Sequence, residues 1–374
     1  MPSYLKTTAP SGGFGTVFKV IKKTLTGSVS QSVPSQVQPT IVGGAPNLQD
    51  LLTQVSTSSN ENERIEAAER IRQSIDVYSV SSIPEIWYTV KDMVAYDGKE
   101  DSSNRRKTGL KLMITCIQRD EYTSGSRMAY YYSIVNNFNV DDFDLQLRAL
   151  KELTGNGRSM DDLFFTAKRI PSVLIEWFQK LAEQPESNKK LHDLLVYIKD
   201  SFTQNSIFFD RTDIINLITM TIETAQNRLT IYHRHTSARD IDDTQIDSII
   251  RDCLEILELI TTHAFIPSHT LPQLVNMLCL VPEPSSLSGQ VWKLVDKLSR
   301  GYISHNFFIG LCNVLKSPKD SKPYILQTSA FYLQCLVQLY VAEKRDSDLL
   351  IIDVMEAYNL SIDSKSLNPE LDFF

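Results

Sequence analysis

The stretch of this chain that comes nearest to a chemical motif is Gly13-Phe14-Gly15-Thr16-Val17-Phe18-Lys19. Its glycine spacing is typical of part of a kinase glycine-rich loop, whose flexible backbone covers the phosphates of a nucleotide. A kinase also needs a lysine on a following strand, a His-Arg-Asp catalytic loop and an Asp-Phe-Gly metal site. The sequence contains neither of the last two motifs. We therefore interpret this stretch as an unstructured segment, and we expect no bound cofactor.

His233-Arg234-His235 is the segment that most suggests a metal site. Residues at i and i+2 lie on different faces of a helix, and no cysteine or acidic pair is spaced to complete a tetrahedral set of ligands. We expect an exposed loop here, and we expect no metal ligands and no catalytic residues in the chain. The five cysteines are too few, and odd in number, for a disulfide framework, so we interpret them as small buried side chains in a reducing compartment.

The basic trio Arg105, Arg106 and Lys107 raises the question of nucleic-acid binding. No aromatic platform is interleaved with the trio, and the net charge of −7 argues against bulk electrostatic attraction to nucleic acid. We expect the trio to lie on a solvated helix face, and we expect no nucleic-acid partner.

Aromatic side chains crowd at three places in the chain beyond what one helix face can bury. Three successive rings on a helix point in different directions, so at most two of three adjacent tyrosines can face one surface. Each ring taken singly also fits a core position. The candidate partner-contact residues are Tyr130, Tyr131, Tyr132, Phe164, Phe165, Phe208 and Phe209.

The candidate contact residues must be positioned by amphipathic helices. From residue 248 to residue 315, the sequence contains two copies of one pair of such helices. Apolar residues of the first helix of each pair recur 38 positions apart (253 to 291), and those of the second helix recur 36 positions apart (271 to 307). The first copy contains Cys253, Ile256, Leu257 and Ile260, followed by Leu271, Leu274, Val275 and Leu278. The second copy contains Val291, Leu294, Val295 and Leu298, followed by Phe307, Leu311 and Val314, with Gly310 where Leu274 predicts a larger residue.

A helix, loop and helix repeated about every 36 to 40 residues is typical of a HEAT- or armadillo-like α-solenoid. One helical hairpin cannot cover its own apolar faces, whereas a stack of hairpins can. The alternative is an ordinary helical bundle in which two hairpins are similar by chance. We predict an all-α chain that folds as a HEAT/armadillo-like α-solenoid of stacked helical hairpins, without β-sheet.

Composition divides the chain into three parts. Residues 1–46 contain no acidic residue and four lysines, together with a long tract rich in Ser, Thr, Gln, Pro and Val, and we expect a disordered, weakly basic leader. The solenoid is expected over residues 47–360, and residues 361–374 are expected to form a frayed tail at a truncation point. Residues 261–282 lack Asp, Glu, Lys and Arg, as a membrane span would, but they contain three prolines, which argue against a span. We therefore predict no integral membrane segment.

Three stretches of the sequence resemble the amino-terminal helical-repeat region of the tuberin family. They are Leu147–Arg158, which ends in Thr-Gly-Asn-Gly-Arg, then Leu174-Ile175-Glu176-Trp177, and then His263–Leu315 with Val291-Trp292-Lys293-Leu294 inside it. Each motif is weak alone, but their order and spacing are collinear with the family across about residues 50 to 345. The leader does not visibly match.

The resemblance implies a non-catalytic scaffold arm of a GTPase-activating protein that acts on the small GTPase Rheb, upstream of the TOR growth kinase. It implies a hamartin-like coiled-coil partner for the arm and a cytoplasmic location, peripheral to endomembranes through partners. The family's catalytic domain with its asparagine thumb lies far downstream of such an arm, so Rheb would be reached only through that domain, and Asn156 is not the thumb. We therefore expect the natural protein to continue past Phe374.

Two other functions stay open from the sequence. The chain could be a generic HEAT/armadillo adaptor in another intracellular pathway such as transport. It could also be an enzyme fragment whose site is dispersed beyond what a sequence reveals.

The interpretation of the glycine-containing stretch is testable with ATP. Calorimetric titration of the chain with ATP and magnesium should show no saturable heat, because the other parts of a kinase phosphate site are missing. Saturable binding that disappears when Gly13 and Gly15 are substituted would contradict this interpretation.

Overall fold

The structure is a computed structural model that describes residues 47–95, 102–122, 125–159, 161–163, 166–235, 243–282, 285–300, 303–316 and 323–342. The chain divides into two units, Met1–Gly44 and Ala45–Phe374. The leader of residues 1–46 and the tail of residues 361–374 lie outside the described residues.

The described residues form helices and contain no strand, which confirms the predicted all-α class. The α-helices are α1 (Leu48–Thr57), α2 (Glu61–Gln73), α3 (Ile83–Val90), α4 (Ser102–Arg119), α5 (Ser126–Asn136), α6 (Phe143–Leu153), α7 (Ile170–Ala182), α8 (Asn188–Asn205), α9 (Arg211–His235), α10 (Asp243–His263), α11 (Leu271–Cys279), α12 (Ser288–Arg300), α13 (Ser304–Lys316) and α14 (Pro323–Ala342). Short 3-10 helices connect some of them: η1 (Ile75–Val77), η2 (Val80–Ser82), η3 (Lys91–Val94), η4 (Val140–Asp142), η5 (Asp161–Leu163), η6 (Pro185–Ser187), η7 (Ser206–Phe208) and η8 (Ser268–Thr270).

Local sequence signals set several helix starts. The side chain of Asn60 accepts a hydrogen bond from the backbone N–H of Asn62 at the start of α2, and its amide donates to Glu63. Such a cap satisfies one of the backbone donors that a first helical turn leaves unpaired. Proline occupies the first turn of α3, α7 and α11, where its missing N–H removes no helical hydrogen bond.

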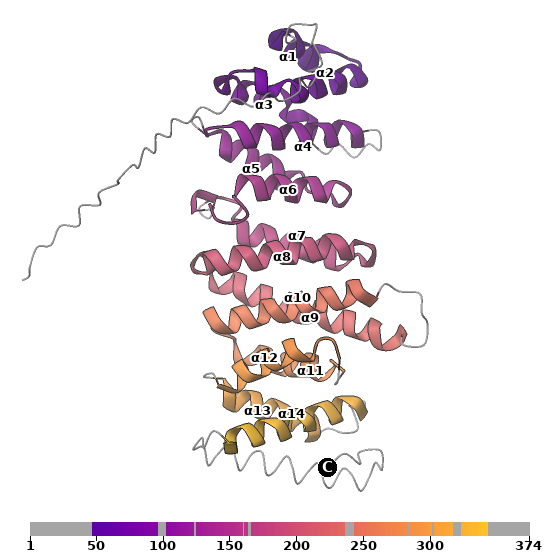
Figure 1. Cartoon of the computed structure of the whole chain (residues 1–374), viewed down its shortest axis with the longest axis vertical. Coiled ribbons are helices and arrows are strands. Elements are labelled where there is room, and N and C mark those ends of the chain that lie inside the picture. The colour runs from indigo at the N-terminus through magenta and orange to yellow at the C-terminus, as the bar shows by residue number, and fades with distance from the viewer. Residues whose placement is uncertain are drawn as a thin grey trace, which may run out of the picture. The chain divides into compact units, whose positions relative to one another are not determined.

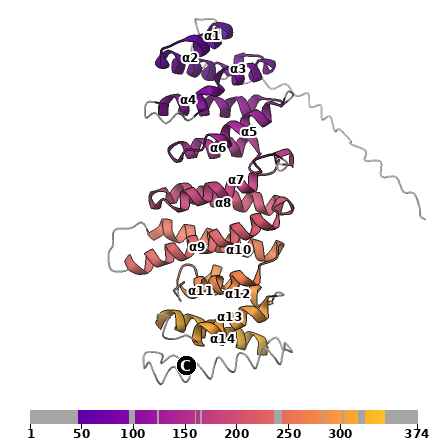
Figure 2. The same ribbon diagram turned by 180° about the vertical axis from the view of Figure 1, so that it is seen from behind.

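The helices of the second unit stack in chain order from α1 to α14 (Figures 1 and 2). One row is formed by α2, α4, α6, α8, α10 and α12, each of which contacts the next. In a second row, α7, α9, α11 and α13 contact one another in sequence. Consecutive helices such as α7 and α8, or α9 and α10, join the two rows. This two-row stack is the predicted α-solenoid.

The two copies of the repeated pair occupy equivalent places in the stack. The first copy corresponds to α10 and α11 and the second to α12 and α13, so α10 contacts α12 in one row and α11 contacts α13 in the other. All the apolar residues that define the repeat are buried. Gly310 of α13 lies against Val275 of α11, and a Cβ atom added at Gly310 would be 2.9 Å from Cγ2 of Val275. The absent side chain therefore permits close contact between α11 and α13.

Arg106 corrects the expectation that the basic trio is solvated. Its side chain is 2% exposed, and its Nε donates to Oδ2 of Asp142 at 2.8 Å, while the carboxylate-bearing side chain of Asp142 is 3% exposed. Its Nη2 also donates to the carbonyl oxygen of Asn137 at 3.1 Å. The helix face that carries Arg106 is covered by α5 and η4, so a guanidinium with a carboxylate partner could be buried where a lone charge could not. Lys107, the next residue, is exposed as expected.

Replacing Gly310 with leucine should destabilise the chain by about 1 to 3 kcal/mol, because the new side chain overpacks the contact with Val275. The matched control is Gly289→Leu in α12, where an added Cβ meets nothing within 4 Å. Urea denaturation followed by circular dichroism measures both. Equal stability of the two variants would show that α11 and α13 do not approach closely at Gly310.

Replacing Arg106 with alanine should cost about 3 to 5 kcal/mol of unfolding free energy, because the carboxylate of Asp142 would stay buried without its guanidinium. Lys107→Ala, which removes the neighbouring exposed charge, should change stability by no more than about 0.5 kcal/mol. Thermal and urea denaturation distinguish the two. A mild effect at Arg106, equal to that at Lys107, would contradict the burial of the ion pair.

Candidate functional site

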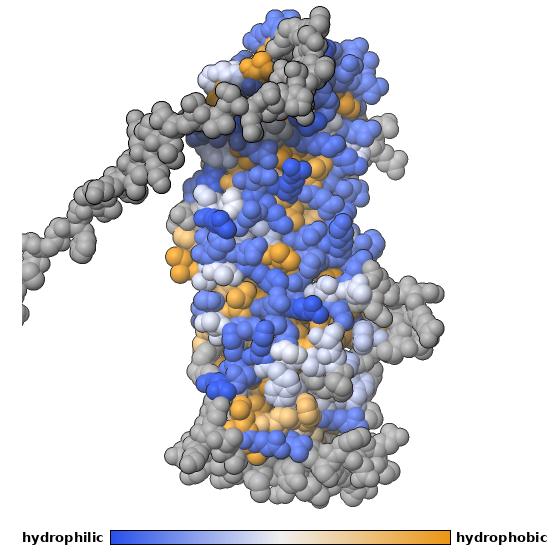
Figure 3. All heavy atoms as spheres, in the orientation of Figure 1, coloured by the Kyte–Doolittle hydropathy of each residue, from blue (hydrophilic) through white to orange (hydrophobic). Residues whose placement is uncertain are grey.

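The surface shown in Figure 3 is mostly hydrophilic, and its apolar residues lie in small separated groups. Single exposed apolar side chains are common on folded proteins and carry little information on their own. The most exposed large apolar residue among those described is Ile207, at 86%, in the connection between α8 and α9. A contact site on this surface is therefore expected at a groove or pocket.

The structure places three of the seven predicted contact residues in the core, namely Tyr130, Tyr131 and Phe209. The hydroxyl of Tyr130 donates to Oδ2 of Asp120 at 2.9 Å, and that of Tyr131 donates to the carbonyl oxygen of Lys168 at 2.5 Å. Because both rings are covered and both hydroxyls are hydrogen-bonded within the chain, these tyrosines are not available to a partner. Phe209 packs edge-on against Phe202, with ring centroids 5.0 Å apart.

The remaining predicted contact residues divide into two groups. Tyr132 and Phe208 are partly buried and pack against the core, so each keeps some exposed surface. Phe164 and Phe165 lie outside the described residues. The structure thus does not bring the seven aromatic residues together into one surface.

The histidine pair lies in a helix and not in the loop expected from the sequence. Helix α9 continues through His235. Among the described residues, no group of three or more His, Cys, Asp or Glu side chains is arranged to hold a metal ion. Four of the five cysteines are buried, and burial raises the pKa of the Cys279 thiol to about 12. Burial also raises the pKa of the Cys116 and Cys253 thiols, so these three thiols are poorly nucleophilic.

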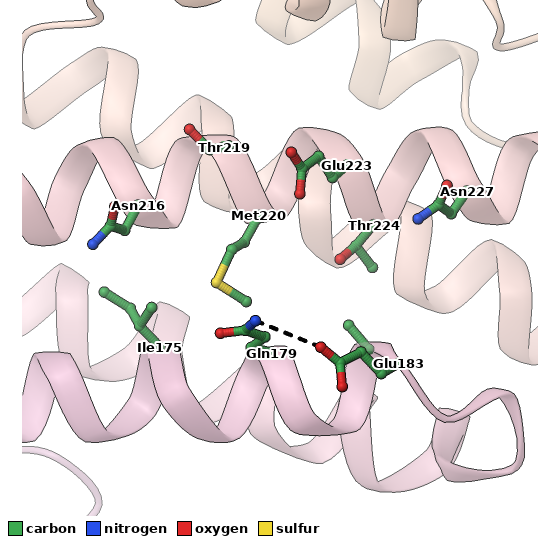
Figure 4. Close-up of a pocket in the computed structure, with 10 residues that line it drawn as sticks. Ile175, Gln179, Glu183, Asn216, Thr219, Met220, Glu223, Thr224 and Asn227 are labelled. Carbon is green, nitrogen blue, oxygen red and sulfur yellow. Dashed lines mark hydrogen bonds between the residues drawn. The ribbon is translucent and has the colours of Figure 1, made fainter.

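An open groove lies between α7 and α9 (Figure 4). Its volume is about 430 Å³, which is within the range of about 300 to 1,000 Å³ usual for binding sites. Helix α7 contributes Ile175, Gln179 and Ala182, together with Glu183 directly after it, and helix α9 contributes Asn216, Thr219, Met220, Glu223, Thr224 and Asn227. Both sets have helical spacing, so the groove runs along the two helices.

The groove has a mixed apolar and polar lining, whose most deeply buried residue is Thr224, at 5% exposure. Met220 extends from α9 toward Gln179 of α7 (Figure 4), and the apolar residues Ile175 and Ala182 also line the groove. These apolar side chains are partly exposed, whereas the rim residues Gln179, Glu183, Asn216, Glu223 and Asn227 are exposed. The amide of Gln179 donates to the carboxylate of Glu183 at 3.5 Å.

An arginine fixes the two helices at one end of the groove. Arg169, the residue before α7, donates to the carboxylates of Asp210 at 2.5 Å and of Asp213 at the start of α9. The backbone N–H of Asp213 and then the Arg169 guanidinium lower the pKa of Asp210. Burial raises the pKa of Asp213, whose side chain is only 6% exposed. This cluster holds the amino-terminal ends of α7 and α9 at a set separation.

A second arginine lies at the other end. Arg228 of α9 is 4% exposed, and its Nη2 lies 3.5 Å from the carbonyl oxygen of Ala182, the last residue of α7. A cation at this position interacts favourably with the negative end of the helix dipole of α7. Burial lowers the pKa of the Arg228 guanidinium from its ordinary value. The two walls of the groove are thus fixed at both ends.

Sequence reasoning missed every residue of this groove. Within its own helical sequence, each lining residue has the pattern of a solvated helix face, as for Gln179 and Glu183 or Met220 and Glu223. The groove exists only because α7 and α9 are neighbours in the stack, although the middles of the two helices lie about 47 positions apart in sequence (176 to 223). The only local signal is a methionine among polar residues on the face of α9 that carries Asn216, Glu223 and Asn227.

Comparison with known proteins places the fold. No described helix is both long and apolar enough to cross a membrane. No curated protein matches the chain. Among solved structures, the chain is similar to the structure of the TSC2 (tuberin) N-terminus, with a TM-score of 0.65 and 22% sequence identity, and the match covers 83% of this chain and 77% of that chain. The expected likeness to the amino-terminal region of tuberin is thereby confirmed at the level of the fold.

A family match covers most of the sequence. The family described as "Domain of unknown function (DUF3384)" matches residues 61–373, which include every described helix from α2 to α14. The chain therefore belongs to the DUF3384 family.

Proposed function

We propose that this chain is a non-catalytic scaffold arm of a tuberin-like GTPase-activating protein for Rheb, and that the arm binds a hamartin-like coiled-coil partner in regulation of the TOR pathway. Two observations support the proposal. The stretches Leu147–Arg158, Leu174–Trp177 and His263–Leu315 resemble the tuberin family in order and spacing. The fold is similar to that of the TSC2 N-terminus.

The groove between α7 and α9 is the observation that most favours partner binding. Its walls are two helices fixed at both ends by arginines, and its lining offers Ile175 and Met220 to an apolar side chain. An amphipathic helix, which is the unit of a coiled coil, can place its apolar face in such a groove.

The proposed location is the cytoplasm, with membranes reached through partners. The buried free cysteines Cys116, Cys253, Cys279 and Cys312 fit a reducing compartment, because none is placed for disulfide bonding in the described residues. Rheb would be engaged by a separate catalytic domain and not by this arm.

A hamartin-like coiled-coil segment should bind the purified chain with one-to-one or two-to-two stoichiometry. Calorimetry gives the affinity, and light scattering gives the mass of the complex. The control is the same segment with its a and d positions changed to polar residues, which should not bind, because it lacks the apolar seam. Failure of the unmodified segment to bind a helical, monodisperse chain would remove the named partner from the proposal.

A further inference from the structure

The backbone of the groove restricts what can bind there. Both walls are α-helices, so their backbone N–H and C=O groups are hydrogen-bonded within each helix over most of its length. An extended peptide would find no strand edge to pair with, and its backbone groups could pair only with side chains such as the amides of Gln179, Asn216 and Asn227. A helix brings its backbone already satisfied and offers only side chains. The groove therefore favours a helix over an extended segment.

The length of the groove fits a short helical segment. Its lining on α9 runs from Asn216 to Asn227, which corresponds to about 16 Å, or three turns, at 1.5 Å per residue. Ile175 and Met220 give an apolar contact near the middle. Methionine adapts its shape to different neighbours, so Met220 can pack against more than one type of apolar side chain.

The charged residues that line the groove are all acidic. Glu183 directly after α7 and Glu223 on α9 are its only charged lining residues, so a carboxylate stands on each wall. Two nearby cations have other partners: Lys180 binds Glu176 at 2.6 Å, and Arg228 is buried with its Nη2 directed to the carbonyl oxygen of Ala182. The amide side chains of Gln179, Asn216 and Asn227 add hydrogen-bonding groups along the rim.

We propose that the groove between α7 and α9 binds one amphipathic helix of a partner chain that carries Lys or Arg on both sides of an apolar residue. The apolar residue contacts Met220 and Ile175, and the flanking cations lie against Glu183 and Glu223. Complementary rim charges mainly set association rate and choice of partner, whereas the apolar contact supplies affinity. This inference rests on the proposed scaffold function, because it gives the partner of the arm a contact surface.

Synthetic helical peptides of about 20 residues test the inference on the full chain. One peptide carries a central leucine flanked by lysines at helical spacing, and its matched counterpart carries glutamates at the same positions. The probe of position is the methyl group of Met220, observed by carbon–proton correlation spectroscopy of methionine-labelled protein and assigned with Met220→Leu. The basic peptide should bind and shift the Met220 signal, and the acidic peptide should do neither.

Charge variants distinguish binding in the groove from nonspecific electrostatic attraction to an acidic protein. The double variant Glu183→Gln and Glu223→Gln should bind the basic peptide about threefold to tenfold more weakly, as expected for two exposed ion pairs. The control double variant Glu66→Gln and Glu85→Gln removes two exposed carboxylates from α2 and α3 and should bind like the unaltered chain. Glu183→Lys with Glu223→Lys should reverse the preference in favour of the acidic peptide.

An unmoved Met220 signal at saturating basic peptide would overturn the inference, and so would equal binding of the basic peptide by the groove variant and the control variant. The hamartin-like segment is measured in parallel with the same variants. Binding of that segment unaffected by the groove variants would overturn the inference and leave the scaffold function standing. If a basic peptide binds in the groove and a hamartin-like segment does not bind at all, the groove keeps its binding role and the hamartin-like partner is removed from the proposed function.

Discussion

The fold depends on the burial of apolar helix faces between successive helical pairs. Helix α10 carries seven buried aliphatic side chains, and the gross stabilisation is about 1.5 to 3 kcal/mol for each: Ile246, Ile249, Ile250, Leu254, Ile256, Leu257 and Ile260. No single pair can cover these faces, because α10 needs α8 and α12 as well as its own partner α9. Stability is therefore a property of neighbours, as in other repeat proteins, and a defect at one interface weakens the interfaces beside it.

The same stacking decides where a partner can bind. Between α11 and α13, the absence of a side chain at Gly310 lets the helices close on Val275. Between α7 and α9, Arg169 and Arg228 fix the ends of the helices, and the middle stays open around Met220. The groove therefore lies between two neighbouring helices of one row. Its polar rim lets it face water without becoming a site of nonspecific association.

The fold was predictable because its signal is local. The apolar spacing of Cys253, Ile256, Leu257 and Ile260 sits within one helix, and its recurrence 38 positions later (253 to 291) reveals the repeat. The buried ion pair of Arg106 with Asp142 was not predictable, because a basic residue on a helix reads as solvated unless its distant partner is known. Tyr130 and Tyr131 were uninformative for the same reason, since core and contact aromatics have the same sequence pattern. The groove needed the adjacency of α7 and α9, which no single helix encodes.

We propose above all that this solenoid is a partner-binding arm whose contact surface includes the groove between α7 and α9. Photocrosslinking tests it most directly, with a benzophenone amino acid in place of Met220 in the full chain and a hamartin-like coiled-coil segment as partner. We predict a crosslink that maps to one helical stretch of the partner with Lys or Arg beside the crosslinked residue. A partner that binds with full affinity but crosslinks only from a control position such as Glu66, and never from Met220, would contradict the claim.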